Sequence, residues 1–194
     1  SELTFLALPT PCRGNKIDLS YVKSATAALG LALSKKSGYH AVVVKSTVVP
    51  GTCSKEVIPL LEKKSGKKAG EFGLCMNPEF LREGKAVSDF MNPDRIVIGQ
   101  FDKKSGDYLA KAYKKFNTDI LRTSLENAEM IKYASNSLLA TLISFSNEIA
   151  DICETVPGAD AAEVFKGVYL DKRLNPIVNK KRINPEILTY IYPG

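Results

Sequence analysis

Short, wholly apolar segments that alternate with helix-like segments restrict the fold of this chain more than any other feature of its sequence. Ala41-Val42-Val43-Val44 has no polar alternation, which is typical of a strand buried on both faces of a parallel sheet. Comparable apolar runs lie at 3–8, 72–76 and 96–98, and a short last strand is expected at 119–122. Helices are expected over 18–36, from 50–52 onward and near 106–116. The alternation predicts an α/β fold with a doubly wound sheet.

The G-x-G-x-x-G turn that follows the first strand of a dinucleotide-binding sheet is not found in the chain. Residues 1–122 are therefore expected to form the second half of a Rossmann-like parallel sheet. From Thr123 the pattern changes, because a capping box at 123–126 opens a segment in which apolar residues recur every three or four positions. We predict a long central helix over 124–156, a shorter helix over 160–168, and a loop over 171–194 with one helical turn near 185–188. Residues 123–194 thus read as a small all-α domain.

Composition narrows the class of protein. Of the 194 residues, 44% are hydrophobic and 25% charged, as in an ordinary globular domain. The net charge of +6 comes mostly from lysine pairs beside Gly, Ser or Asp, which favours solvated helix ends and anionic substrates over a nucleic-acid partner. No apolar stretch reaches the ~20 residues of a membrane span, and no signal peptide is visible. The four cysteines form no CxxC pair, which argues against a metal site and fits a reducing cytoplasm.

The run Asn77-Pro78-Glu79-Phe80-Leu81-Arg82-Glu83-Gly84 follows the apolar segment 72–76. It is expected at a strand end, where open α/β sheets place their ligands. Glu79 and Glu83 are four residues apart, so one helical turn would put them on the same side. Apolar Phe80 and Leu81 beside Glu79 would raise the pKa of its carboxyl and make it a base near neutral pH. The alternative is a pair of solvated turn carboxylates.

Three further motifs carry polar groups at positions where a ligand could bind. Thr10 and Pro11 end the first apolar segment, although turn chemistry alone explains such residues. Ser46 and Thr47 end the 41–44 strand and precede a helix N-terminus, which suits an anionic or polar ligand. Lys132 and Asn136 are four residues apart on one helix face. Together they could stabilise an alkoxide, although an exposed polar face explains them equally simply.

These motifs, in this order over nearly the whole chain, resemble the nucleotide-sugar dehydrogenases of the UDP-glucose dehydrogenase type. The resemblance implies oxidation of a sugar C6 alcohol to a carboxylate in two hydride transfers to NAD, with the aldehyde trapped on a cysteine. UDP-glucose is the first expected substrate, and GDP-mannose or an N-acetylated UDP-sugar are alternatives. The chain departs from the family at Pro9, where a glycine usually precedes the Thr-Pro pair.

The resemblance also implies roles for individual residues. Thr10, Pro11, Ser46, Thr47 and Glu83 are expected to bind NAD, with Thr47 also holding a water and Glu83 near the nicotinamide. Glu79 is expected to handle protons during hydrolysis, and Lys132 and Asn136 to touch the reacting oxygen. The substrate's sugar is expected to contact four residues of the 77–84 run, Phe80, Leu81, Arg82 and Glu83. Arg173 would reach the sugar site of a neighbouring subunit, and Tyr190 would begin the loop that grips the nucleotide diphosphate.

We therefore expect an internal fragment of such an enzyme, with the catalytic cysteine loop and Gly-rich turn outside these residues and no activity of its own. A homodimer through the helix at 124–156 is expected because Met130, Tyr133, Leu139 and Ile143 lie outside its main apolar stripe. The resembled family also dimerises there. Two rival readings are a non-catalytic helical dimerisation module and a β-hydroxyacid dehydrogenase. The Asn-Pro-Glu-Phe-Leu run speaks against the second.

Overall fold

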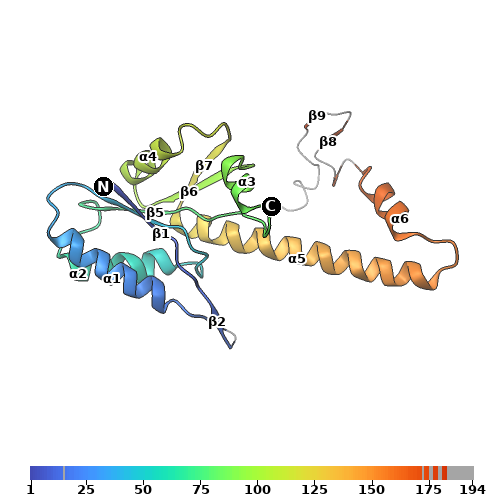
Figure 1. Cartoon of the computed structure of the whole chain (residues 1–194), viewed down its shortest axis with the longest axis horizontal. Helices are drawn as coiled ribbons and strands as arrows, with labels where there is room; N and C mark the ends of the chain where they lie inside the picture. Colours follow the sequence, from blue (N-terminus) through green and yellow to red (C-terminus); the bar gives the residue numbers. More distant parts are fainter. Residues whose placement is uncertain (15, 172, 175–176, 179–180, 183–194) are drawn as a thin grey trace, which may run out of the picture. The chain divides into compact units, whose positions relative to one another are not determined.

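A five-stranded sheet organises the first part of the computed structural model (Figure 1). The structure describes residues 1–14, 16–171, 173–174, 177–178 and 181–182. It divides into two compact units, 1–136 and 137–194. The strands run in the order β1 (Leu3–Leu6), β4 (Ala41–Val44), β5 (Gly73–Met76), β6 (Ile96–Gln100) and β7 (Ile120–Thr123).

The mostly parallel α/β sheet confirms the predicted fold class, with one departure. β1, β4 and β5 are parallel, and so are β6 and β7, but β5 and β6 are antiparallel. The connection between β5 and β6 contains only α3 (Ala86–Met91), a helix of about 9 Å. The chain therefore re-enters the sheet at the edge where β5 ended. There the Asn77 amide donates to the carbonyl oxygen of Val97 at 2.8 Å.

The two faces of the sheet are buried by different helices, which explains why the β4 sequence is apolar throughout. Val42 and Val44 belong to a core cluster with residues of α1 (Ser20–Ser34) and α2 (Ile58–Ser65). Val43 belongs to a second cluster with Leu109 of α4 (Lys103–Ala112). Figure 1 shows α1 and α2 side by side on one side of the sheet and α4 on the other.

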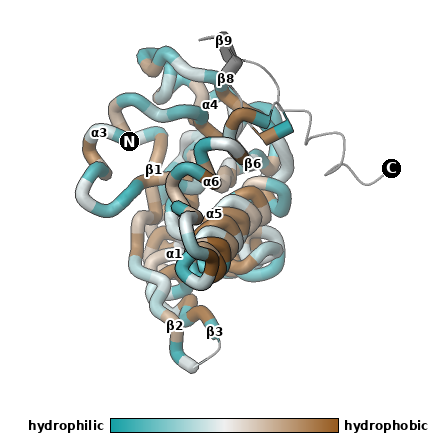
Figure 2. The backbone as a smooth tube through the Cα atoms, turned by 90° about the vertical axis from the view of Figure 1, so that its right-hand side faces the viewer, coloured by the Kyte–Doolittle hydropathy of each residue, from teal (hydrophilic) through white to brown (hydrophobic). Residues whose placement is uncertain are grey.

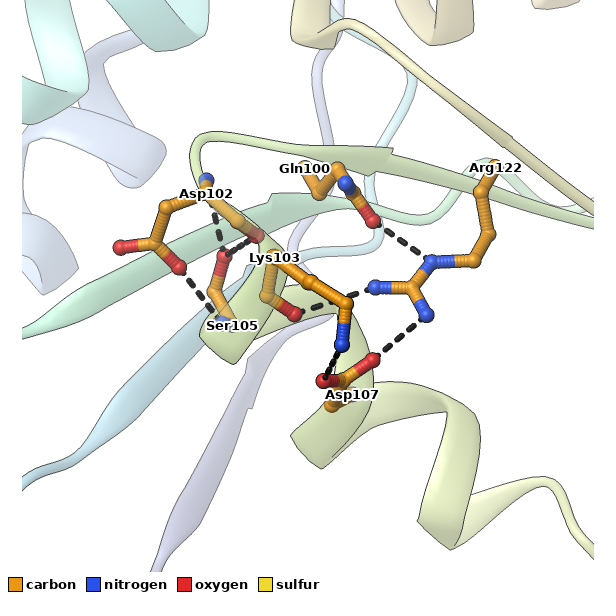
Figure 3. A network of polar contacts seen from close by, with 6 residues as sticks. All are labelled: Gln100, Asp102, Lys103, Ser105, Asp107 and Arg122. Atoms are coloured by element: carbon orange, nitrogen blue, oxygen red, sulfur yellow. Dashed lines mark hydrogen bonds and ion pairs between the residues drawn. The ribbon is translucent and has the colours of Figure 1, made fainter.

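The start of α4 is fixed to the sheet by a polar network at β6 and β7 (Figure 3). The Asp102 carboxylate accepts from the backbone N–H of Ser105 at 2.6 Å and caps the helix. From β7, the Arg122 guanidinium donates to Gln100 Oε1 at 2.7 Å and to the Lys103 carbonyl at 3.0 Å, and it pairs with Asp107 at 2.6 Å. One arginine thus joins both strands to the helix.

Several elements were not expected from the sequence. A short hairpin of β2 (Cys12–Arg13) and β3 (Lys16–Ile17) follows β1, and α3 lies inside the 77–95 connection. The segment from 53 begins with a π-helical stretch, η1 (Cys53–Val57), which leads into α2. These pieces are too short to leave a hydrophobic period in the sequence.

The long helix α5 (Leu125–Thr155) has nearly the predicted length. Its first turn is capped by Ser124, whose hydroxyl accepts from the backbone N–H of Asn127 at 3.2 Å. Leu125 and Ala128 are buried in the core cluster of the first unit. Gly99 of β6 allows this approach, because a Cβ there would lie 2.5 Å from the Ala128 Cβ.

The second unit contains the rest of α5, α6 (Ala161–Val168) and a two-stranded ladder of β8 (Ile177–Val178) and β9 (Lys181–Arg182). The all-α prediction for this region, and the loop over 171–194, are wrong at this ladder, where β-branched Ile177 and Val178 favour extended backbone. The helical turn predicted near 185–188 lies outside the described residues. Phe145 and Phe165 pack edge to face, with ring centroids 6.3 Å apart. Across the described part of the chain, no helix has the length and hydrophobicity needed to span a membrane.

Candidate active site

Three loops that follow the carboxyl ends of β1, β4 and β5 bring most of the predicted site residues into the first unit. Thr10 comes after β1, Thr47 after β4 and Glu79 after β5. The Thr10 hydroxyl donates to the Thr47 carbonyl at 2.9 Å, so the first two loops touch. This edge of an open α/β sheet is the usual place for a bound nucleotide.

Ser46, just after β4, links the same two loops through hydrogen bonds with Leu8. Its buried hydroxyl accepts from the backbone N–H of Leu8 at 2.7 Å and donates to the Leu8 carbonyl at 2.6 Å. Pro11 is exposed, and its carbonyl accepts from the backbone N–H of Asp18 at 2.8 Å. Among the residues predicted to bind the cofactor, Ser46 therefore holds the main chain of the two loops in place, and Thr10 and Thr47 lie beside each other.

Glu79 and Lys132 form the central ion pair of this region. Lys132 Nζ lies 2.8 Å from Glu79 Oε1, and the Lys132 side chain is only 8% exposed. The Lys132 ammonium also lies 5.4 Å from the centre of the Phe80 ring, and the Arg95 guanidinium stacks on that ring at 4.0 Å. Arg95 donates in turn to the Ser135 hydroxyl at 3.3 Å. The loop after β5 is thus fastened to α5 by charge and by an aromatic ring.

The environment of Glu79 lowers the pKa of its carboxyl, which corrects the prediction of a raised value. Burial alone would raise the pKa, but hydrogen bonds from Lys132 and from the backbone N–H of Leu81, with the charges of Lys132 and Lys45, outweigh it. Apolar neighbours in sequence gave the wrong sign, because the deciding partner comes from a helix far along the chain. Glu79 is an anion at neutral pH.

Residues 79–83 are not helical, so the expected helical turn with Glu79 and Glu83 on one side is wrong. The Glu79 carboxylate accepts from the backbone N–H of Leu81 at 2.7 Å, a local bond that competes with helix formation. Glu83 and Leu81 are exposed, and Arg82 is engaged with Asp89 of α3 at 2.6 Å. Phe80 is half-buried, with its ring 4.0 Å from the Arg95 guanidinium and 5.4 Å from the Lys132 ammonium, so its side chain lies next to the ion pair.

Three predicted residues remain, Asn136, Arg173 and Tyr190. Asn136 is exposed on α5, one helical turn beyond Lys132. Arg173 lies in the second unit, where it pairs with Asp171 at 2.5 Å. Tyr190 lies outside the described residues.

A carboxylate that sequence reasoning missed occupies the helix N-terminus at which a ligand anion was expected. Glu129 is fully buried, and its two oxygens accept from the backbone N–H of Gly51 at 2.5 Å and of Cys53 at 2.8 Å. Such N–H groups at a helix start are a ready anion site. Here the protein supplies its own anion, so these two N–H groups are already bound, and binding of a ligand by Ser46 and Thr47 stays a prediction.

Lys45 is the second residue that was missed. Burial lowers the pKa of its ammonium to about 8, despite the favourable charge of Glu79 and with the opposing charge of Lys132. Its Nζ points toward the Pro78 carbonyl at 3.5 Å. Two ammonium groups therefore act on one carboxylate at the edge of the sheet. Such a cluster of fixed donors can stabilise negative charge that develops on a substrate oxygen. Among the described residues, no group of three His, Cys, Asp or Glu side chains could hold a metal ion.

Two family models match this chain. The NAD-binding domain of the UDP-glucose/GDP-mannose dehydrogenase family matches residues 1–117, and the central domain of that family matches residues 126–187. The chain is 44% identical to the GDP-mannose 6-dehydrogenase of Pseudomonas aeruginosa over 177 residues, which are 90% of this chain and 40% of that protein. It is also 44% identical to the UDP-glucose 6-dehydrogenase of Haloferax volcanii over 181 residues, 90% of this chain and 42% of that protein.

Solved structures agree with this assignment. A ternary complex of a Pseudomonas aeruginosa GDP-mannose dehydrogenase superposes with a TM-score of 0.86 at 44% identity, covering 90% of this chain and 40% of that one. A UDP-glucose dehydrogenase from Pyrobaculum islandicum gives 0.84 at 41% identity with the same coverage. The chain spans about 40% of the length of the relatives it matches.

Proposed function

Because this chain belongs to the UDP-glucose/GDP-mannose dehydrogenase family, we propose that the enzyme of which it forms a part oxidises a nucleotide sugar at its C6 alcohol, in two hydride transfers to NAD. The observation that carries the proposal is the ion pair of buried Lys132 with half-buried Glu79, which lies at the same end of the sheet as the loops with Thr10 and Thr47. A dinucleotide and a polar substrate would meet at this edge of the sheet.

Lys132 is the proposed electrostatic catalyst. Its ammonium is held in place by Glu79 and by the Phe80 ring, so little reorganisation is needed when an alkoxide forms on the substrate. Asn136, one helical turn further along α5, would add an amide donor to the same oxygen. Glu79 pairs with the Lys132 ammonium at 2.8 Å, and as an anion it can receive a proton from a water during hydrolysis.

The cofactor would lie along the loops after β1 and β4. Bound NAD supplies the hydride acceptor. Thr10 and Thr47 fit one side of such a ligand, because the two loops are held together at 2.9 Å and end adjacent parallel strands. Ser46 fixes the backbone beneath them, and Pro11 and Glu83 would contribute from the exposed rim.

Two substrates compete within this proposal. The motif order led us to expect UDP-glucose, whereas several similar relatives are GDP-mannose 6-dehydrogenases. Both substrates present a C6 alcohol to the same ion pair, so the part of the chain described here supports either. The family likeness also supports NAD as the oxidant in both cases.

A homodimer through α5 is the proposed assembly. Beyond the first unit, α5 exposes large apolar side chains on more than one face, with exposed fractions near one half or above at Leu138, Leu139, Leu142, Ile143 and Phe145. Figure 2 shows hydrophobic stretches in brown in successive turns of α5. A helix of this kind needs further partners. A second copy of the same helix across a two-fold axis would supply one.

The function is tested on the full-length enzyme by following NADH absorbance with NAD and either UDP-glucose or GDP-mannose. We expect two NADH per sugar with one of them, and none with the free hexose as control. No NADH from any nucleotide sugar would refute the proposal. A yield of one NADH per sugar would leave a dehydrogenase that stops at the aldehyde, contrary to the proposed two-step reaction.

A further inference from the structure

One turn of α5 is tied to two separate loops of the candidate site by buried charges. Glu129 binds the backbone N–H groups of Gly51 and Cys53, in the turn that leads from the loop after β4 into η1. Three residues later Lys132 binds Glu79, in the loop after β5. Glu129 and Lys132 are 0% and 6% exposed. The position of α5 therefore determines where both loops lie.

Each oxygen of the Glu129 carboxylate accepts a hydrogen bond from a different backbone N–H, which fixes the orientation of the side chain. Gly51, whose N–H binds one of these oxygens, has a φ of 90°, a backbone conformation that glycine adopts without strain. A carboxylate accepts on both oxygens, whereas an amide of the same shape accepts on one and donates on the other. Only an acid of this length can satisfy the two N–H groups at once.

We propose that Glu129 is a positioning residue, which sets the place of the Lys132 ammonium and of the 47–52 loop with Thr47. The inference rests on the proposed function, in which Lys132 acts on the reacting oxygen. Glu129 touches neither substrate nor cofactor. It acts by fixing the position and rotation of α5 against the sheet, and Lys132 projects from that helix.

The structural consequence can be measured without any substrate. In Glu129→Gln, one backbone N–H at the start of η1 faces an amide NH₂ instead of an oxygen and loses its partner. Hydrogen exchange of peptides that span 47–57 should become at least about ten times faster in the full-length variant. The matched control is Glu126→Gln, the same change at an exposed position in the first turn of α5. It should leave these peptides unchanged.

The kinetic consequence separates positioning from general loss of stability. Displacement of Lys132 by about 1 Å should lower kcat by about 10- to 100-fold, with KM nearly unchanged. Glu129→Asp, whose carboxylate is one methylene shorter, should lose kcat in the same direction, which keeps the test valid if the Gln variant folds poorly. In a Lys132→Ala background the part of the effect that passes through Lys132 is already lost, so Glu129→Gln should cost much less activity there than in the wild type.

Each result bears on one part of the inference. Unchanged exchange over 47–57 in Glu129→Gln, or kcat losses that simply multiply with those of Lys132→Ala, would overturn the positioning role. A lower melting temperature with normal kcat per folded molecule would also overturn it, because that is the mark of a purely structural contact. If the wild-type enzyme oxidises no nucleotide sugar, the proposed function fails on its own, and the exchange measurement still decides whether Glu129 holds the loop.

Discussion

Gly99 should be the glycine at which a single methyl group is most damaging to the fold. A Cβ at this position of β6 would lie 2.5 Å from the Ala128 Cβ, 2.9 Å from the Ser124 carbonyl oxygen and 3.1 Å from the Leu125 Cα. Carbon atoms in contact normally lie about 3.5–4.0 Å apart, so the start of α5 would have to move by about 1 Å. Two of these three atoms belong to backbone and cannot rotate away.

Overpacking of this kind costs about 1–3 kcal/mol, and the backbone contacts place Gly99→Ala in the upper half, at about 2–3 kcal/mol. For a protein of this size the melting temperature should fall by about 4–12 °C. Gly106→Ala is the matched control, because its new methyl would meet the ends of flexible side chains, Gln100 and Arg122 in the network of Figure 3. In Gly106→Ala, displacing these exposed side chains should cost about 0–1 kcal/mol of stability. The higher helix propensity of alanine over glycine should return about 1 kcal/mol.

Urea denaturation followed by circular dichroism measures both variants against the wild type. The expected result is a clear loss for Gly99→Ala and a change near zero for Gly106→Ala. Equal stability of Gly99→Ala and the wild type would show that α5 is not held against β6 as described. Equal losses in the two variants would show that the difference between rigid and flexible neighbours has no bearing on stability here.

Three further predictions concern charge and assembly. In the full-length enzyme, Lys132→Ala should lower kcat by about 10²–10³-fold with little change in KM; an NADH assay that finds only weaker affinity would contradict this. Burial lowers the pKa of Lys45 to about 8, below the value of about 10.4 in an unfolded chain. Between these two pH values Lys45 is protonated in the unfolded state but not in the folded state, so the free energy of unfolding rises with pH. The rise is at most about 1.4 kcal/mol per pH unit. The stability advantage of Lys45→Met over the wild type in urea should therefore shrink from pH 8 to pH 10, and a constant difference would refute it. Leu139→Glu should reduce the mass found by light scattering from dimer to monomer, whereas a wild-type monomer would exclude assembly through α5.

The main strands of the sheet could be predicted because a strand that is buried on both faces needs an uninterrupted run of apolar residues. The β4 residues point alternately to the two core clusters, Val42 and Val44 to one and Val43 to the other, so none can be polar. The length of α5 was equally accessible, because its apolar period continues without a break. Short elements such as α3 and η1 carry too few residues for a period to be visible.

The chemistry of the site was less accessible, because it depends on partners from distant parts of the chain. The residues beside Glu79 in sequence are apolar and suggest a raised pKa, but Lys132 reverses the shift. The residues after Val44 suggest an open helix N-terminus, but Glu129 fills it. In each case the local pattern missed a charged partner that comes from α5.

The first turns of α5 show how such partners could have been found. Leu125, Ala128, Glu129 and Lys132 occupy positions i, i+3, i+4 and i+7, which together make one face of a helix. All four are buried, at 4%, 0%, 0% and 6% exposure. A search for apolar residues alone begins this stripe later and assigns the two charges to solvent. A charge that stands where a helical period requires an apolar residue must find a partner inside the protein, since an unpaired buried charge is too costly to keep. Glu129 and Lys132 are such residues, and their partners lie in the two loops that the proposed reaction needs.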